Sequence, residues 1–404
     1  MPKFTETSNK LLKFINSNKI INSIEEITKK NTLKCIFESF KNFDNTRKFE
    51  LQEEINIPKR KDIKDCPSVY NKTNNNNNYK SYFNKFNQNL ITKHFNININ
   101  NKILQEMLYN NNYISLDVID FAESNDLIYH RYTSDNITLN IFFVDTLTIN
   151  IDYILLLTHV INNLSFIKNK TKNKLVTINI LLSPNKKVLY DKTNNLADSN
   201  ILTQFNVNSG MSFADQVYVW RQEEVYKVLV HELIHNFDLD DKTNTNYKHN
   251  FNINQPEINT NEAYVEVFAE IINCVFINYV LYKNMKDFEK YIIIEINYSA
   301  FQTAKILNFF KIKSLEDILN KNLNKNIMNQ TSNVFSYYII KAALLLNILN
   351  SNTSSFINLI EESLKNKDFS NCVNRYLEIL NNTKTNKDEE IFNNLRMTCL
   401  EIIN

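Results

Sequence analysis

A single glycine, Gly210, occurs among the 404 residues of this chain, and this scarcity limits the folds open to it. Phosphate-binding loops, Rossmann dinucleotide turns, kinase glycine-rich loops and the nucleophile elbow of serine hydrolases each need more than one glycine. Their usual forms are therefore excluded. Helix ends and tight turns still need residues with positive φ, and we expect asparagine, the next most tolerant residue type, to supply them.

The composition is otherwise that of a globular protein with a buried core. Hydrophobic residues make up 43% and charged residues 22% of the chain, which are ordinary values. The 46 basic and 44 acidic side chains give a formal net charge of +2, so no long-range field favours nucleic acid or an anionic membrane. Basic stretches interleaved with aromatic residues are also absent, which argues against a nucleic-acid partner.

The sequence contains no recognisable targeting segment. The most apolar stretch, 141–160, is interrupted by Asp145, Asn150 and Asp152, so no membrane-spanning helix is predicted. The N-terminus lacks the apolar core of a signal peptide. The five cysteines are scattered without a CxxC pair, which argues against a disulfide framework and against a cysteine zinc site. We expect a cytoplasmic protein without a membrane partner.

Apolar spacing gives a coarse order of elements along the chain. Residues 1–60 carry helical spacing, and 101–130 reads as mainly helical. A strand is predicted over 137–145, followed by a helix capped by Asn150. A second strand is predicted over 175–183.

The second half of the chain changes character. Extended chain is predicted over 201–219, around Gly210, and a long helix over 219–237. After a polar loop, further helices are predicted over 260–282, 287–311, 334–349, 352–365, 370–381 and 387–402. Strands therefore occupy the middle of the chain, and the C-terminal third is predicted to be entirely helical. This order of elements indicates an α+β fold.

The long helix carries the pattern most closely tied to chemistry, His231-Glu232-x-x-His235. Four residues advance a helix by about 400°, so the two imidazoles project from nearly the same side, one turn apart. Imidazole nitrogens in that arrangement can share a zinc ion at about 2.0–2.1 Å. Glu232 can then act as general base without ligating the metal, as in the HExxH arrangement. The alternative is a buried helix with two core histidines.

A zinc site of this kind needs a third protein ligand, and Glu262 is the favoured candidate. Glu262 and Glu266 share one helix face, four residues apart. One carboxylate can therefore bind metal while the other contacts a ligand imidazole and fixes its tautomer. Against this, Glu262 could form a capping box with Asn259, and Glu266 could belong to a solvated face.

Two other residues compete for the third position. Asp241 follows His235 at the spacing of a metzincin third ligand. That pattern has glycine where this chain has Asp238, because the helix must break sharply there. His249 also lies within reach of the linker, although its spacing does not recommend it.

The HExxH pattern followed by Asn261-Glu262-x-x-x-Glu266 resembles the gluzincin metallopeptidases, the thermolysin-like clan. The resemblance covers roughly residues 175–285 and is specific in the two helices. It implies one zinc ion held by the two histidines and Glu262, with Glu266 in contact with a ligand histidine. Two features depart from the clan. The gap before Glu262 is longer than usual, and no aminopeptidase exopeptidase motif is present.

The resemblance also implies where a substrate would lie. In the clan, a β-sheet lobe ends in an edge strand that pairs with the substrate backbone. The extended segment 206–213 looks like this edge, with Asn208, Ser209 and Gly210 as substrate-binding residues. A lone glycine suits a place where another backbone approaches closely, although an ordinary tight turn would also account for it.

Gluzincins stabilise the oxyanion with a Tyr or His from the C-terminal lobe. By this resemblance, Tyr337 and Tyr338 are the candidates, with Tyr298 behind them. The alternative for each is a core tyrosine.

The predicted architecture joins these inferences. A small central β-sheet lobe has its edge strand packed on the HExxH helix and is followed by an all-helical C-terminal lobe. Three regions are predicted: a mainly helical N-terminal region over 1–130 with an asparagine-rich loop at 71–79, a zincin-like catalytic core over 131–285, and a helical lobe over 286–404.

The predicted function is that of a zinc-dependent metallopeptidase, an endopeptidase that uses one zinc ion and Glu232 as general base on a peptide or protein substrate. One alternative is a gluzincin-fold binding or scaffold protein that has lost turnover. Another is a zinc-dependent hydrolase of a different amide. Paired carboxylate, serine and cysteine mechanisms have no local pattern to support them.

Overall fold

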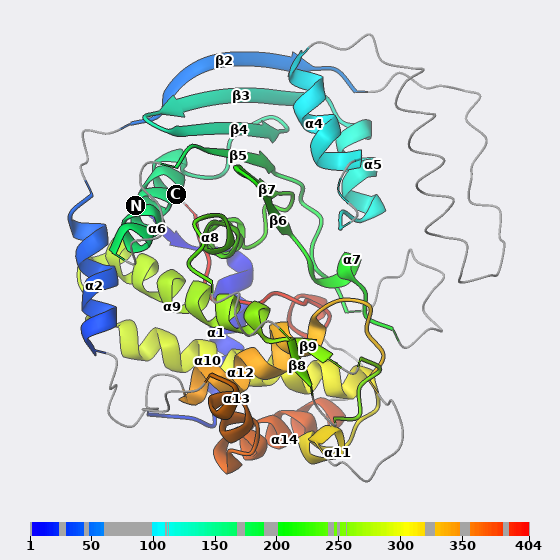
Figure 1. Ribbon diagram of the computed structural model, residues 1–404. Coiled ribbons are helices and arrows are strands. Elements are labelled where there is room, and N and C mark those ends of the chain that lie inside the picture. The colour runs from blue at the N-terminus through cyan, green and yellow to red at the C-terminus, as the bar shows by residue number, and fades with distance from the viewer. Residues whose placement is uncertain are drawn as a thin grey trace, which may run out of the picture.

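The computed structural model combines one mixed β-sheet with a mostly helical C-terminal region, as predicted (Figure 1). It describes residues 2–23, 30–43, 48–59, 99–109, 111, 113–167, 174–189, 201–240, 246–248, 251–255, 257–319, 328–347, 356–382 and 388–403. The predicted asparagine-rich loop at 71–79 lies outside these residues. The division into three regions stays a prediction.

Six strands form the main sheet, in the order β2-β3-β4-β5-β7-β6. The first three are antiparallel, β4, β5 and β7 are parallel, and β6 returns antiparallel to β7. Strand β6 therefore lies at one end of the sheet. The strands are β2 Glu50–Ile57, β3 Leu127–Ser134, β4 Ile137–Phe143, β5 Val176–Leu181, β6 Gly210–Phe213 and β7 Gln216–Val219.

Helices cover both faces of this sheet (Figure 1). On one face lie α4 Ile99–Tyr109 and α5 Leu116–Ser124, which bury a small apolar cluster against Tyr129, Phe142 and Trp220. On the other lie α6 Ile151–Ile167 and α8 Val225–Asn236, which belong to the main core. The short helix α7 Gln204–Val207 precedes β6. The sheet thus holds α8 between itself and the helical region.

The helical region is built around α9 Thr260–Tyr282 and α10 Phe288–Phe309, which pack on each other. The N-terminal helices α1 Glu6–Asn18 and α2 Lys30–Lys41 join the same layers, α1 on α10 and α2 on α9 and α6. The remaining helices are α11 Leu315–Leu319, the π-helix η2 Phe335–Ile340, α12 Lys341–Asn347, α13 Phe356–Leu364, α14 Lys367–Asn382 and α15 Glu389–Phe392. Two small sheets pair β1 Lys3–Phe4 with β10 Ile402–Ile403 and β8 Asn246–Lys248 with β9 Glu257–Asn259.

Several predicted elements are confirmed. Strands β4 and β5 lie within the predicted ranges, and Asn150 caps α6 by accepting from the Asp152 backbone N–H. Helix α9 spans the predicted 260–282.

Three predicted elements are wrong. Residues 1–60 are not helical throughout, because β2 forms there as an outer strand on β3. Helix α8 begins at Val225, because residues up to Val219 pair in the sheet and Glu224 takes a left-handed conformation. The helix predicted over 387–402 is confined to α15, so the C-terminal third is not entirely helical. The chain beyond α15 instead bonds to buried side chains.

No asparagine in the described part of the chain adopts a positive φ. The residues that adopt it are Asp135, Asp145, Ala214, Glu224, Asp238, Lys283 and Lys311. Gly210 itself does not have positive φ. The expectation about asparagine was therefore wrong, and so was the explanation of Gly210 as a tight turn.

One described helix, α9, is long and apolar enough to cross a membrane by length and composition alone. However, 83% of its most apolar window is buried inside the structure. Burial on that scale is what a core helix of a soluble protein shows.

Candidate metal centre

Helix α8 brings the two histidines of the HExxH pattern together. Every residue from Val225 to Ile234 is buried, because the helix lies between the sheet and α9. His231 Nε2 and His235 Nε2 lie 3.2 Å apart on one side of the helix. His231 and Glu232 are each 7% exposed, while the His235 side chain is 20% exposed, so the site is mostly buried and opens to solvent at His235.

Helix α9 supplies a third side chain at the same point. Glu262 Oε2 lies 3.5 Å from His231 Nε2 and 3.6 Å from His235 Nε2. Asn259 does cap α9, but its side chain accepts from the Asn261 backbone N–H, and the Glu262 carboxylate faces the histidines. The three side chains form a group that could hold a metal ion.

The dimensions of this triangle fit zinc. Ligand atoms about 2.0–2.1 Å from a tetrahedral ion are about 3.3 Å from one another. The three edges here are 3.2, 3.5 and 3.6 Å. Two imidazoles and one carboxylate are also a donor set found at catalytic zinc sites that keep a fourth position for water.

Glu266 supports the first histidine. Its Oε1 lies 2.7 Å from His231 Nδ1, one helical turn after Glu262. A carboxylate at Nδ1 favours the tautomer that carries its proton there and leaves the Nε2 lone pair for a metal. Glu266 is 3% exposed and so is not part of a solvated face.

Asp240 supports the second histidine, a contact that was not predicted from the sequence. His235 Nδ1 lies 3.0 Å from Asp240 Oδ2, which also accepts from Asn261 Nδ2 at 3.0 Å. The chain returns to this position because Asp238 takes φ +52° and ends α8 sharply. Asp238 therefore supplies the left-handed residue for which the metzincin pattern uses glycine. The available signal was the acidic run that follows His235.

In the metal-free chain, the imidazole and carboxylate charges of the site stabilise one another. Burial would lower the pKa of His231, but the Glu266 and Glu262 carboxylates outweigh it and raise the pKa. Burial likewise opposes the charged form of His235, yet Asp240 and Glu262 raise its pKa to about 10. Burial would raise the pKa of Glu262, but the two imidazoles lower it to about 2. A metal cation would replace these protons as the partner of the carboxylates.

Glu232 has the environment expected of a proton acceptor. Burial raises its pKa above the ordinary value, while the His231 and His235 charges oppose that rise. A raised pKa means that this carboxylate takes up a proton more readily than an exposed glutamate does.

Gly210 lies directly against this side chain. A Cβ placed on Gly210 would come within 2.7 Å of both Glu232 Oε1 and Val228 Cγ1. The side chains of α8 therefore leave no space for a Cβ at this position, and the predicted approach of another backbone stays a prediction. Its neighbours Asn208 and Ser209 precede β6; Ser209 is 4% exposed, and its carbonyl accepts from the Trp220 backbone N–H.

The three tyrosines predicted as oxyanion donors lie in different surroundings. The Tyr337 ring packs edge-on against His231 with centroids 6.4 Å apart, and burial followed by the charge of Glu262 raises its pKa. The Tyr338 hydroxyl instead donates to Leu395 O at 2.6 Å. Tyr298 donates to Asn394 Oδ1. Tyr338 and Tyr298 therefore engage the C-terminal segment, so of these candidates only Tyr337 borders the histidines. The alternative ligands Asp241 and His249 lie outside the described residues.

The fold and the site define a mixed α+β protein with a buried group of two histidines and one glutamate that could hold a metal ion. An uncharacterized protein of Acanthamoeba polyphaga mimivirus is 26% identical over 207 residues, which cover 45% of this chain and 52% of that protein. The match thus spans about half the length of this relative. No family model matches the chain, and no solved structure matches it.

Proposed function

We propose that this protein is a zinc-dependent metallopeptidase. The observation that carries the proposal is the triangle of ligand atoms on α8 and α9, with edges of 3.2, 3.5 and 3.6 Å. Its size fits tetrahedral zinc. Carboxylates at the outer nitrogens of both histidines complete the support that catalytic zinc ligands receive.

The roles of the residues follow from their positions. A zinc ion bound by His231, His235 and Glu262 would supply a Lewis acid and lower the pKa of a water molecule toward about 7. Glu232 takes the proton of the attacking water and delivers it to the leaving amine. Tyr337 beside His231 is the candidate donor to the oxyanion.

Strand β6 is the proposed substrate-binding edge. In the described part of the chain it pairs with β7 on one side, and Gly210 at its start touches Glu232. A peptide added along the outer edge would place its scissile carbonyl near the general base, which favours an endopeptidase.

The test combines metal analysis with peptide cleavage. The purified chain should contain about one zinc per molecule and cleave members of a mixed peptide library, and a chelator should abolish cleavage. Glu232→Gln should keep the zinc and lose hydrolysis by at least about 1,000-fold, since the proton acceptor is gone. Glu378→Gln, at an exposed site on α14, is the matched control and should cleave normally.

Two results would contradict the proposal. A chain that takes up no zinc is no metalloenzyme, and a Glu232→Gln variant with full activity would remove the general base. Zinc uptake without any cleavage would favour the binding or scaffold protein instead.

A further inference from the structure

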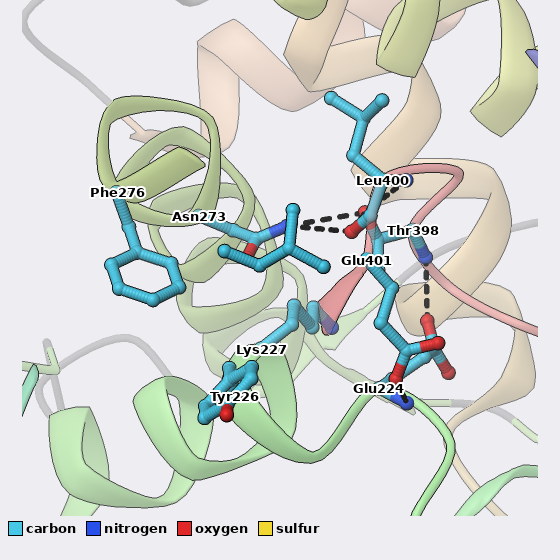
Figure 2. Close-up of a pocket in the computed structure, with 9 residues that line it drawn as sticks. Glu224, Tyr226, Lys227, Asn273, Phe276, Thr398, Leu400 and Glu401 are labelled. Carbon is cyan, nitrogen blue, oxygen red and sulfur yellow. Dashed lines mark hydrogen bonds between the residues drawn. The ribbon is translucent and has the colours of Figure 1, made fainter. Parts of the chain in front are cut away.

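A buried lysine lies one helical turn before the first histidine on α8. Lys227 is 2% exposed, and its Nζ contacts Glu266 Oε2. Its other polar neighbour is Met397 Sδ at 3.7 Å. Figure 2 shows Lys227 among the side chains that line a small pocket between α8, α9 and the C-terminal segment.

The two oxygens of Glu266 therefore have different partners. Oε1 lies 2.7 Å from His231 Nδ1, and Oε2 contacts Lys227. A carboxylate held at one oxygen can still rotate about its last torsion, because such terminal torsions are broad. A second contact at the other oxygen fixes the plane of the carboxylate and hence the direction in which it meets the imidazole.

The structure contains other buried lysine–glutamate pairs, which serve as internal comparisons. Lys341 Nζ lies 2.8 Å from Glu270 Oε2, and Lys187 contacts Glu224. All these side chains are nearly inaccessible to solvent. Among the described pairs, only that of Lys227 includes a carboxylate that also touches a member of the histidine–glutamate triangle.

We propose that Lys227 is a positioning residue for the metal centre, acting through Glu266 on the orientation of His231. This inference rests on the proposed function. A buried ion pair adds little stability over apolar side chains of similar volume, and the pair of Lys227 differs from the others because its carboxylate also meets His231. The chain Lys227–Glu266–His231 instead gives the ammonium group a role in the geometry of the site.

The experiment measures zinc affinity by competition with a chromophoric chelator. Lys227→Met should weaken zinc binding about 10-fold, the lower end of the effect of losing a partner that orients a metal ligand. Lys341→Met is the matched control: it removes an equally buried lysine from a glutamate on α9 that does not contact a histidine. It should leave zinc affinity within about twofold of the wild type. The visible spectrum of bound Co²⁺ should change in Lys227→Met alone.

A comparison made in the Glu266→Gln background keeps the test decisive if Lys227→Met does not fold. Lys227→Met with Glu266→Gln removes both charges together and avoids an unpaired buried carboxylate. Because Lys227 acts through Glu266, this double variant should bind zinc as Glu266→Gln alone does, within about twofold.

The outcomes separate this inference from the proposed function. If the wild type binds zinc but Lys227→Met and Lys341→Met lose equal affinity, or neither loses any, the positioning role is overturned and the metal centre stands. A double variant about 10-fold weaker than Glu266→Gln would overturn it in the same way. A wild-type chain that binds no zinc would overturn the proposed function itself.

Discussion

At the scale of single residues, the side chains that surround Gly210 explain why position 210 requires glycine. Its backbone has no need of glycine, because its φ is not positive. The constraint is the space beside Glu232 and Val228, where an added Cβ would lie 2.7 Å from each side chain. Heavy atoms that close would force one side to move, so the positions of β6 and of Glu232, the proposed general base, depend on each other.

Gly210→Ala should therefore reduce hydrolysis about 100-fold, the scale on which a 1 Å misplacement affects a reaction. It should also lower the free energy of unfolding by about 1–3 kcal/mol through overpacking. Zinc affinity should be unchanged, because the atoms nearest to the added Cβ belong to Glu232 and Val228, which are not proposed ligands. Glu378→Gln, at the exposed site on α14, is again the control. Wild-type activity in Gly210→Ala would show that the position of Glu232 does not matter.

The charge of His235 gives the metal-free chain a predictable pH response. Its pKa is about 10 in the fold against 6.5 for a free histidine. A raised pKa stabilises the fold fully below about 6.5, and the contribution is lost as pH rises toward about 10. Zinc binding has the opposite trend, because it requires neutral imidazoles.

The free energy of unfolding of the metal-free protein should therefore fall between pH 6.5 and 10, and zinc should stabilise the fold more at the higher pH. Urea unfolding at both ends of this range, with and without zinc, measures both trends. His235→Gln removes this titrating group and should reduce the slope of the metal-free curve, while His231, whose pKa is also raised, keeps a part of it. Equal slopes in the two proteins would show that His235 is not charged in the fold.

At the scale of elements, helix ends show how the chain folds with one glycine. Helix α10 ends in a Schellman arrangement, in which Lys311 N–H donates to Asn308 O and Ile312 N–H donates to Leu307 O. Lys311 is exposed and has φ +57°. A side chain in this conformation costs about 1–2 kcal/mol.

Lys311→Gly should raise the free energy of unfolding by about 0.5–1 kcal/mol, since relief of that strain exceeds the added entropy of the unfolded chain. Lys313→Gly, two residues further along with ordinary φ, should instead be neutral or destabilising. Urea unfolding of the two variants decides the matter. An equal effect of both would mean that φ at residue 311 carries no strain.

These elements also show what the sequence could and could not predict. The histidine pair and the two glutamates of α9 were predictable, because residues four apart on one helix share a face. Asp240 was not, because it lies beyond the end of α8 and reaches His235 only through the left-handed Asp238. The apolar spacing near Ile391 predicted a helix that continues to residue 402, although the helix ends at Phe392. Spacing alone cannot reveal that the backbone after this point hydrogen-bonds to side chains of other helices.

At the scale of the whole molecule, the C-terminal segment 394–401 lies inside the helical region and not on its surface. Glu224 accepts from the backbone N–H groups of Met397 and Thr398, each at 2.6 Å. Glu295 accepts from those of Cys399 and Leu400 at 2.9 Å. Figure 2 shows part of this arrangement beside α8, where Asn273 bonds to Thr398 and Leu400.

Other buried side chains hold the carbonyl groups of the segment: Tyr338 donates to Leu395 O, Gln302 to Arg396 O and Lys341 to Met397 O. The segment therefore bonds to residues from the start of α8, from α9 and α10, and from the helical stretch 335–347. Beyond it, β10 pairs with β1, which ties the two ends of the described chain together (Figure 1).

Truncation after residue 393 should consequently prevent stable folding. Each buried polar group left without a partner costs about 1–3 kcal/mol, and a buried charge about 3–5 kcal/mol. Glu224 and Lys341 keep their ion-pair partners Lys187 and Glu270, but both lose hydrogen bonds to the segment, and so does Glu295. With the bonds that Tyr338 and Gln302 lose, the cost reaches the roughly 5–15 kcal/mol that stabilises a typical domain. Truncation after residue 401 removes β10 but keeps these partners, so that variant should fold with reduced stability.

A synthetic peptide of residues 394–404 supplies the decisive measurement, because it replaces the missing partners without restoring the covalent link. Added to the chain truncated after 393, it should recover a cooperative thermal transition and zinc binding, both dependent on peptide concentration. A peptide with Thr398→Val and Arg396→Met keeps the backbone but loses the side-chain contacts to Glu295 and Glu223, and should recover less. Stable folding of the truncated chain without any peptide would contradict the role assigned to the segment, since its buried charges would then have found other partners.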